Sequence, residues 1–263
     1  MDTCSSVLAA VRSKKPLVLQ ITNMVTINDC ANITIALGAS PVMSNNPDDA
    51  AELAKNADAL LLNIGTADAK QLEIMRSAAD SAEEKGIPVV LDPVGANASL
   101  FRKKTVCEFM TKYQISIIKG NASEISSIGR GSSAARGIES EDSVNPAVSA
   151  ELALKSGAVV AVSGAADLVT DGKIAVEVAN GVPLMGRVCG TGCMIGSAAA
   201  SAAAAASPFD ASVFAFSSLG IAGERAASYA KGPGSFKAAV FDEAAALTPD
   251  DLERYARIRE VLL

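Results

Sequence analysis

The stretch Gly190-Thr191-Gly192-Cys193-Met194-Ile195-Gly196-Ser197 begins with two closely spaced glycines and runs into an alanine-rich segment, 198–206. Alanine has the highest helix propensity, so this segment predicts a helix that begins at the glycines. The first turn of a helix leaves backbone N–H groups unpaired, and the helix dipole adds positive charge there. A glycine loop at this point is a natural anion site, and the same field favours a thiolate at Cys193. The alternative is a tight strand-to-helix turn beside a buried thiol.

The composition excludes several classes of chemistry. The 263 residues carry a net charge of −6 and no run of five Lys or Arg, which argues against a nucleic-acid or anionic-membrane partner. Histidine is absent, which excludes Ser-His-Asp and Cys-His catalytic units and histidine metal ligands. The five cysteines include no C-x-x-C pair, so neither a zinc site nor a disulfide framework is indicated.

No targeting or membrane segment is predicted. The sequence opens on the acidic Met1-Asp2 rather than on the basic region of a signal peptide. The alanine run 198–206 is too short and too weakly apolar to span a membrane. We therefore expect a cytoplasmic protein.

Continuous apolar strands alternate with helical segments, which predicts one α/β domain over residues 1–263, with a mostly parallel sheet covered by helices on both faces. Asp171-Gly172 predicts a hairpin between 168–170 and 173–178, and the polar segment 128–145 is predicted to be a surface insertion. The expected strands cover 17–21, 59–64, 88–91, 115–119 and 158–162, with a short extended segment at 39–43. The expected helices cover 4–13, 27–37, 48–55, 67–85, 101–112, 146–155, 192–206, 210–230 and 235–246, and a last helix has Thr248 as its N-cap and Pro249 at its first position.

Polar residues and glycines follow the predicted strands one after another. They are Thr22-Asn23, Asn63-Ile64-Gly65-Thr66, Asp92-Pro93, Gly120-Asn121 and Ser163-Gly164. Ligands of open α/β sheets bind outside the carboxyl ends of the strands. These residues are therefore predicted to share one rim with the Gly190 loop beside them.

The common phosphate-binding fingerprints do not fit this sequence. It contains no G-x-x-x-x-G-K-[ST], which excludes a P-loop protein. Gly190-x-Gly192-x-x-x-Gly196 differs from G-x-G-x-x-G by one residue and lies late in the chain, which argues against an NAD site. What remains is a loop whose backbone N–H groups could surround a phosphate, without the lysine that the P-loop motif adds.

Asp92 and Glu124 are the candidate metal ligands. Each follows a buried strand, where an unpaired carboxylate is costly, and Mg²⁺ typically takes one or two carboxylates together with phosphates. The structural alternatives are a turn at Asp92-Pro93 and helix capping by Glu124. Lys119, at a strand end, is either a contact for a nucleotide phosphate or an ordinary surface lysine.

Three further side chains leave a functional and a structural interpretation open. Cys193 could act as a nucleophile or as a general base; a nucleophilic cysteine normally has a His partner, so a base or positioning role fits better. Met43 could line an apolar pocket or fill the core. Asn23 could bind a heteroatom or cap the next helix.

Several segments taken together resemble the hydroxyethylthiazole kinase family, ribokinase-like enzymes of thiamine salvage. They occur in the family's order and span roughly residues 16 to 240. The segments are Ile21-Thr22-Asn23, Leu37-Gly38-Ala39-Ser40-Pro41-Val42-Met43, Leu62-Asn63-Ile64-Gly65-Thr66, Leu91-Asp92-Pro93-Val94-Gly95-Ala96, Gly120-Asn121-Ala122-Ser123-Glu124-Ile125, Gly190-Thr191-Gly192-Cys193 and Lys231-Gly232-Pro233-Gly234-Ser235-Phe236.

The resemblance implies ATP-dependent phosphorylation of the hydroxyl of 4-methyl-5-(2-hydroxyethyl)thiazole, with Mg²⁺, on a ribokinase-like fold without a separate lid. It also implies a homotrimer with active sites between subunits, in which a neighbour excludes water. By position, the thiazole would contact Asn23, Met43 and Gly190; ATP would contact Lys119, Ser163, Asn121 and Gly192; the metal and phosphates would lie near Asp92 and Glu124; and Cys193 would take the place of the aspartate base of sugar-kinase relatives.

The sequence departs from the family pattern at Lys119, where arginine is usual, and at Ser163, where threonine is usual. The first change reduces the capacity for bidentate phosphate contact, and the second keeps the hydroxyl. Three rival functions remain: a non-catalytic thiazole- or thiamine-binding protein; a ribokinase-like enzyme for another substrate, including an NAD(P)H-hydrate dehydratase relative; and a thiol oxidoreductase using Cys193. The third lacks a resolving C-x-x-C partner.

Overall fold

One sheet runs through the whole protein. The structure, a computed structural model, describes residues 3–129 and 145–263. The strand order is β2-β1-β3-β4-β5-β6-β7-β8-β9; β2 to β6 pair in parallel, and β7, β8 and β9 continue the sheet antiparallel. The strands are β1 (Leu17–Ile21), β2 (Ser40–Val42), β3 (Ala59–Asn63), β4 (Val89–Asp92), β5 (Ile117–Asn121), β6 (Val159–Ser163), β7 (Asp167–Thr170), β8 (Ala175–Val178) and β9 (Ile258–Glu260).

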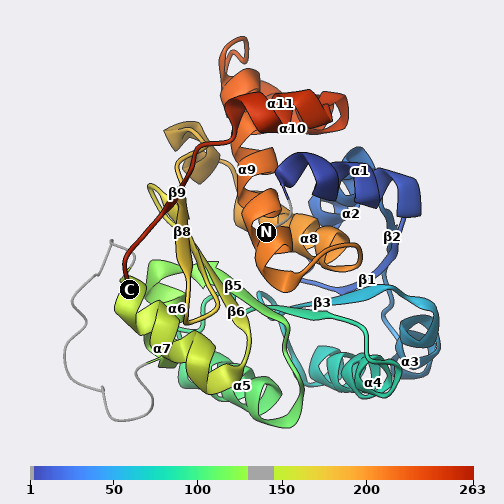
Figure 1. The fold of residues 1–263 in the computed structure, drawn as a ribbon. Coiled ribbons are helices and arrows are strands. Elements are labelled where there is room, and N and C mark those ends of the chain that lie inside the picture. Colours follow the sequence, from blue (N-terminus) through green and yellow to red (C-terminus); the bar gives the residue numbers. More distant parts are fainter. Residues whose placement is uncertain (1–2, 130–144) are drawn as a thin grey trace.

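Helices cover both faces of this sheet (Figure 1), which confirms the predicted α/β architecture. The lower face in this view carries α3 (Pro47–Asn56), α4 (Ala69–Lys85), α5 (Leu100–Lys112), α6 (Ala122–Gly129) and α7 (Pro146–Ser156). The upper side carries α1 (Cys4–Lys14), α2 (Ile27–Leu37), α8 (Thr191–Ala203), α9 (Pro208–Ala227), α10 (Pro233–Ala246) and α11 (Pro249–Tyr255).

The two faces of the sheet build two separate apolar cores. On β3, Ala59 and Leu61 belong to the core with α8 and α9, whereas Leu60 and Leu62 belong to the core with α3, α4 and α5. Side chains alternate between the faces of a strand, so a strand buried on both faces needs the continuous apolar run that the sequence shows. Within the described ranges, no helix is long and apolar enough to cross a membrane.

Several boundaries differ from the predicted ones. Helix α4 begins at Ala69, because the side chain of Asp68 accepts the N–H of Gln71 and caps it. Strand β5 runs to Asn121, and α6 follows at once because the Asn121 side chain accepts the N–H of Glu124. Helix α6, strand β9 and the 3₁₀ turn Pro183–Arg187 were not predicted. Most of the predicted insertion, 130–144, lies outside the described residues.

Helix α8 lies directly on the sheet at the carboxyl ends of its central strands. All of its residues from Met194 to Ala203 are buried, and most of them are alanine, glycine or serine. Small side chains allow close approach of the backbones. A Cβ at Gly196 would lie 3.3 Å from Asp92 Oδ2 and 3.6 Å from Leu61 Cδ1. The absence of that atom seats the first turns of α8 against the end of β4.

Candidate active site

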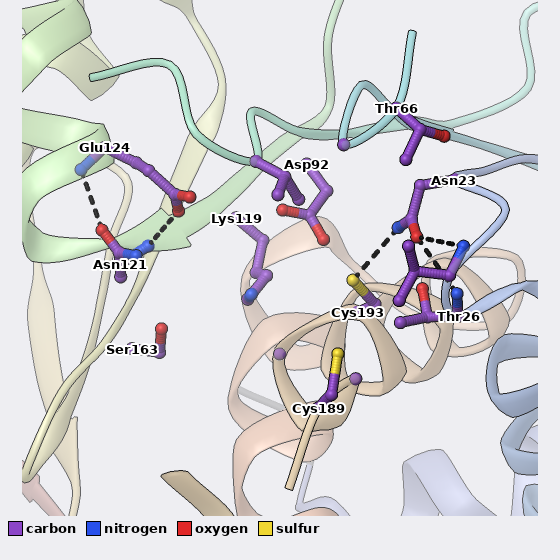
Figure 2. A pocket seen from close by; sticks show the side chains of 15 residues that line it. Asn23, Thr26, Thr66, Asp92, Lys119, Asn121, Glu124, Ser163, Cys189 and Cys193 are labelled. Atoms are coloured by element: carbon purple, nitrogen blue, oxygen red, sulfur yellow. Dashed lines mark hydrogen bonds between the residues drawn. The ribbon is translucent and has the colours of Figure 1, made fainter. Parts of the chain in front are cut away.

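The ends of the central strands and the start of α8 border one cavity (Figure 2). Its volume is about 340 Å³. The predicted rim is therefore present, and it faces the predicted glycine loop. The lining residues are Asn23, Val25, Thr26, Gly65, Thr66, Asp92, Val94, Lys119, Asn121, Glu124, Ser163, Cys189, Gly190, Gly192 and Cys193.

The cavity gathers all of the predicted site residues except Met43. Met43 is half-buried one residue beyond β2, the edge strand of the sheet, and it is not part of the cavity lining. Strand β2 is at the edge of the sheet, and β1 lies between it and the central strands. Met43, which follows β2, therefore lies outside the cavity lining.

Two asparagine side chains hold Cys193 at the centre of the site. Asn23 Nδ2 donates to Asn63 Oδ1 at 2.9 Å and to Cys193 Sγ at 3.4 Å. Asn63 Nδ2 donates to Asp92 Oδ2 at 2.9 Å and to Cys193 Sγ at 3.3 Å. The sulfur therefore accepts hydrogen bonds from two amides (Figure 2 labels Asn23, Asp92 and Cys193).

The orientations of both amides are fixed by backbone groups. Asn23 Oδ1 accepts the N–H groups of Val25 and Thr26, each at 3.1 Å, and Asn63 Oδ1 accepts the N–H of Gly65 at 3.0 Å. Each amide nitrogen must then point at the sulfur. The predicted capping of the next helix by Asn23 is wrong: Thr26 is the N-cap of α2, and the two N–H groups that Asn23 accepts lie in the turn before the helix.

Asn63 was predicted to lie on the rim, but no catalytic or binding role was predicted for it. It is fully buried at the end of β3, and it joins Asp92 to Cys193. A usable signal was present in the sequence, because an asparagine that ends an apolar buried strand must find hydrogen-bond partners. Thr66 lines the cavity as part of the predicted rim, whereas Thr26 and Cys189 line it without having been predicted.

Asp92 presents an unsatisfied oxygen within the site. Its Oδ2 accepts from Asn63, whereas its buried Oδ1 has no hydrogen-bond partner among the described residues. Burial raises the pKa of Asp92 to about 7, with Lys119 opposing the rise and Glu124 adding to it. An unpartnered buried carboxylate oxygen is the kind of atom that a hard cation satisfies.

Glu124 has the capping role that was the structural alternative for it. Its Oε2 accepts the N–H of Asn121 at 2.8 Å while Asn121 Oδ1 accepts the N–H of Glu124 at 2.9 Å. Its Oε1 accepts the N–H of Gly95 at 2.7 Å. Glu124 thus ties the start of α6 to the loop that follows Asp92, and its carboxylate still borders the cavity.

Lys119 is buried rather than on the surface, with 4% of its area exposed. In the part of the chain that the structure describes, its ammonium makes no hydrogen bond or ion pair. Burial opposes its charge, but the carboxylates of Asp92 and Glu124 raise the pKa of Lys119 above its ordinary value. A Cβ at Gly192 would lie 3.2 Å from Lys119 Nζ, so the ammonium points at the first turn of α8. A buried, unpaired cation beside free N–H groups is a binding site for an anion.

The prediction that the helix field favours the Cys193 thiolate is wrong for the free protein. Burial and the nearby Asp92 raise the pKa of the Cys193 thiol above its ordinary value. Hydrogen bonds to Thr26 and Asn63 and the charge of Lys119 lower it, but they do not outweigh burial. The thiol is therefore the resting form at neutral pH.

Gly190 supplies the sharp entry to α8. It is the N-cap residue with a φ of 103°, a left-handed conformation that glycine adopts without steric cost. A Cβ there would lie 2.9 Å from Asp29 Oδ2 and 3.1 Å from Thr26 Cγ2. The backbone can approach α2 this closely only because no side chain intervenes.

Comparison with known proteins identifies the family. The model of the hydroxyethylthiazole kinase family matches residues 8–250. The hydroxyethylthiazole kinase of Methanocorpusculum labreanum is 48% identical over 262 residues, 99% of each chain. The structure of the hydroxyethylthiazole kinase from Pyrococcus horikoshii OT3 superimposes with a TM-score of 0.90 at 37% identity, over 98% of this chain and 99% of that one. A ribokinase-like superfamily protein from Enterococcus faecalis shares the fold, with a TM-score of 0.66 at 15% identity over 93% of this chain and 89% of that one. The chain thus belongs to the hydroxyethylthiazole kinase family and is a phosphotransferase with a ribokinase-like fold.

Proposed function

We propose that this kinase transfers the γ-phosphoryl group of ATP to the hydroxyl of 4-methyl-5-(2-hydroxyethyl)thiazole, in thiamine biosynthesis and salvage. The observation that carries the proposal is the meeting of Cys193, Asp92 and Lys119 in one cavity at the N-terminus of α8. Phosphoryl transfer needs positioning and charge stabilisation more than a strong nucleophile. A centre without histidine can therefore perform it. ATP as co-substrate supports a cytoplasmic location.

Cys193 orients the substrate hydroxyl and takes its proton. The hydroxyl oxygen forms the new bond to phosphorus, and the bond from phosphorus to the departing ADP oxygen breaks. The proton moves to Cys193 Sγ in the fraction of the protein in which Cys193 is a thiolate, so the thiol must lose its own proton to solvent before the step. The amides of Asn23 and Asn63 keep the sulfur in place as an acceptor. The N–H groups of the Gly190–Cys193 loop stabilise charge on the transferred phosphoryl group.

The nucleotide side of the cavity is basic and polar. Lys119 supplies a buried positive charge that has no direct ion pair among the described residues, and Ser163, Asn121 and Gly192 line the same cavity. We assign these four residues to ATP. The lysine acts as a point charge on a phosphate rather than as a bidentate clamp, because an ammonium lacks the planar fork of a guanidinium.

The donor set fits Mg²⁺. Asp92 Oδ1 is buried without a partner among the described residues, and a carboxylate oxygen is the kind of hard ligand that Mg²⁺ prefers. We assign the metal to Asp92, with Glu124 as the second carboxylate beside it. The ion, when bound, neutralises charge on the phosphates. In the free protein Glu124 positions the loop at Gly95 and Asp92 holds Asn63.

The thiazole is assigned to the side of the cavity that Asn23 and Gly190 border, with Met43 supplied by a neighbouring subunit. An apolar strip on the adjoining surface supports assembly as a homotrimer. Ile27, Ala31 and Ile35 share one face of α2, with Ile35 58% exposed, and Met24 is 78% exposed in the preceding loop. Exposed apolar patches of this kind mark interaction surfaces.

The variant Ile35→Glu is expected to separate the subunits and to raise KM for the thiazole alcohol at least tenfold at low protein concentration, because a charge on the strip opposes its burial. Light scattering gives the oligomeric state, and initial rates give KM. Leu154→Glu, at an equally exposed leucine on α7 (61% exposed), is the matched control and should leave both unchanged. A wild-type monomer with full activity would contradict the assignment.

The function is tested by ADP release. Purified protein with MgATP is expected to form ADP only when the thiazole alcohol is added, with one phosphate monoester formed per ADP. Pyridoxal and an analogue lacking the hydroxyl serve as controls. Thiazole binding by calorimetry without ADP release would instead support the non-catalytic binding protein, and ADP release with another alcohol alone would support a different substrate.

A further inference from the structure

Arg102 joins the two loops that lie between the central strands and the lower helices, yet it does not line the cavity. It belongs to the first turn of α5 and is half-buried. Its Nη1 donates to the carbonyl of Val94 at 2.8 Å, and its Nη2 donates to the carbonyl of Gly65 at 2.7 Å. Among the described residues no carboxylate pairs with it, so both guanidinium contacts go to backbone oxygen.

The two carbonyls belong to the loops that carry the site. Val94 and Gly65 both line the cavity. Gly65 also donates its N–H to Asn63 Oδ1, and Asn63 in turn holds Asp92 and Cys193. On the β3 side, Gly65 alone separates the guanidinium from Asn63. On the β4 side, the guanidinium binds Val94, two residues after Asp92.

The guanidinium is seated against the backbone of the second loop. Gly95 has a φ of 70°, and a Cβ there would lie 2.5 Å from Arg102 Nη1. On its other side, Gly95 donates its N–H to Glu124 Oε1 at 2.7 Å. The loop after Asp92 is thus held on both sides: Arg102 donates to the carbonyl of Val94, and Glu124 accepts the N–H of Gly95.

We propose that Arg102 is a positioning residue for phosphoryl transfer: by binding the carbonyls of Gly65 and Val94 together, it fixes the separation of the β3 and β4 loops and hence the geometry of Asn63, Asp92 and Cys193. The proposal rests on the proposed roles of Asp92 and Cys193. Arginine suits the task because its planar fork presents several donors in a fixed arrangement, whereas a lysine ammonium is a single flexible point.

The test compares Arg102→Met and Arg102→Lys with Arg76→Met. Arg76 is a half-buried arginine on α4 whose guanidinium pairs with Glu108 on α5, so its loss alters the surface near the same helix without touching either loop. We expect kcat to fall about 30-fold in both Arg102 variants with KM for ATP and thiazole changed less than threefold, since a misplacement of about 1 Å can cost up to about 100-fold in rate. Arg76→Met should keep the wild-type kcat.

Melting temperatures separate a positioning role from general destabilisation, and all rates are measured well below them. If Arg102→Met does not fold, Arg102→Lys decides alone. Wild-type kcat in the lysine variant would mean that the charge rather than the two-loop contact matters, and would overturn the proposal. So would a loss seen only in KM.

The same assays distinguish this inference from the proposed function. Asp92→Asn is measured in parallel. If Asp92→Asn is inactive while the Arg102 variants keep wild-type kcat, the positioning role alone is wrong. If Asp92→Asn keeps wild-type activity, the assignment of Asp92 fails, and the Arg102 proposal fails with it.

Discussion

Asp92→Asn is expected to lower kcat about 1,000-fold, the size of effect that follows loss of a charge-stabilising group in an active centre. The substitution keeps the size of the side chain, and its amide oxygen can still accept the hydrogen bond from Asn63. It removes the negative charge at the buried oxygen that has no partner among the described residues. The reaction should then need far more Mg²⁺ for half-maximal rate.

Steady-state rates over a Mg²⁺ titration measure both effects. Asp167→Asn is the matched control: Asp167 is also buried, and burial raises its pKa to about 7 as well, but it accepts the N–H of Gly164 and does not line the cavity. The control variant should stay within a few-fold of wild type. An Asp92→Asn enzyme within tenfold of wild type and with unchanged Mg²⁺ dependence would rule out the metal assignment.

Replacement of Cys193 by alanine is expected to lower kcat about 100-fold, the lower range for loss of a general base. Cys193→Asp should retain or raise turnover, because a carboxyl group titrates below a thiol and a larger fraction of it can accept the hydroxyl proton at neutral pH. Cys107→Ala, at an exposed thiol on α5, and Cys189→Ala, at the cavity edge, separate the effect of Cys193 from general thiol loss. Unchanged turnover in Cys193→Ala would remove the base assignment.

The pH profile gives a second and independent reading. The base must be deprotonated to act, and burial and Asp92 raise the pKa of the Cys193 thiol. The wild-type kcat/KM should therefore increase as the pH rises through 7 and 8. In Cys193→Asp the increase should move to lower pH, since a carboxyl group titrates well below a thiol. A flat wild-type profile would indicate that the sulfur only positions the hydroxyl.

The sequence was sufficient to predict the sheet apart from strand β9, the rim and the place of α8. Uninterrupted apolar runs such as 59–62 are typical of strands buried on both faces, and in a parallel sheet the residues that end them meet at one edge. The glycine loop at 190–192 was equally clear, because its residues precede a long alanine helix.

What could not be predicted depends on long-range contacts. The double attachment of Glu124 involves Gly95, 29 residues away. The link from Asn63 to Cys193 spans 130 residues. The direction of the Cys193 pKa shift reflects burial beside Asp92, which local sequence does not reveal. Met43 lies outside the cavity of a single chain, so its proposed contact depends on a second molecule.

Because of Gly196, mutations in the interior beside α8 are selected for their effect on the catalytic rate as well as for their effect on folding. Helix α8 can rest on Asp92 only because position 196 has no side chain, and an outward shift of the helix would widen the gap between the phosphoryl-binding amides and the carboxylate. An inherited change among the neighbouring alanines could leave the chain folded and still be eliminated by selection, because it would slow the reaction. We therefore expect this part of the molecule to accept fewer amino-acid substitutions during evolution than folding alone would permit.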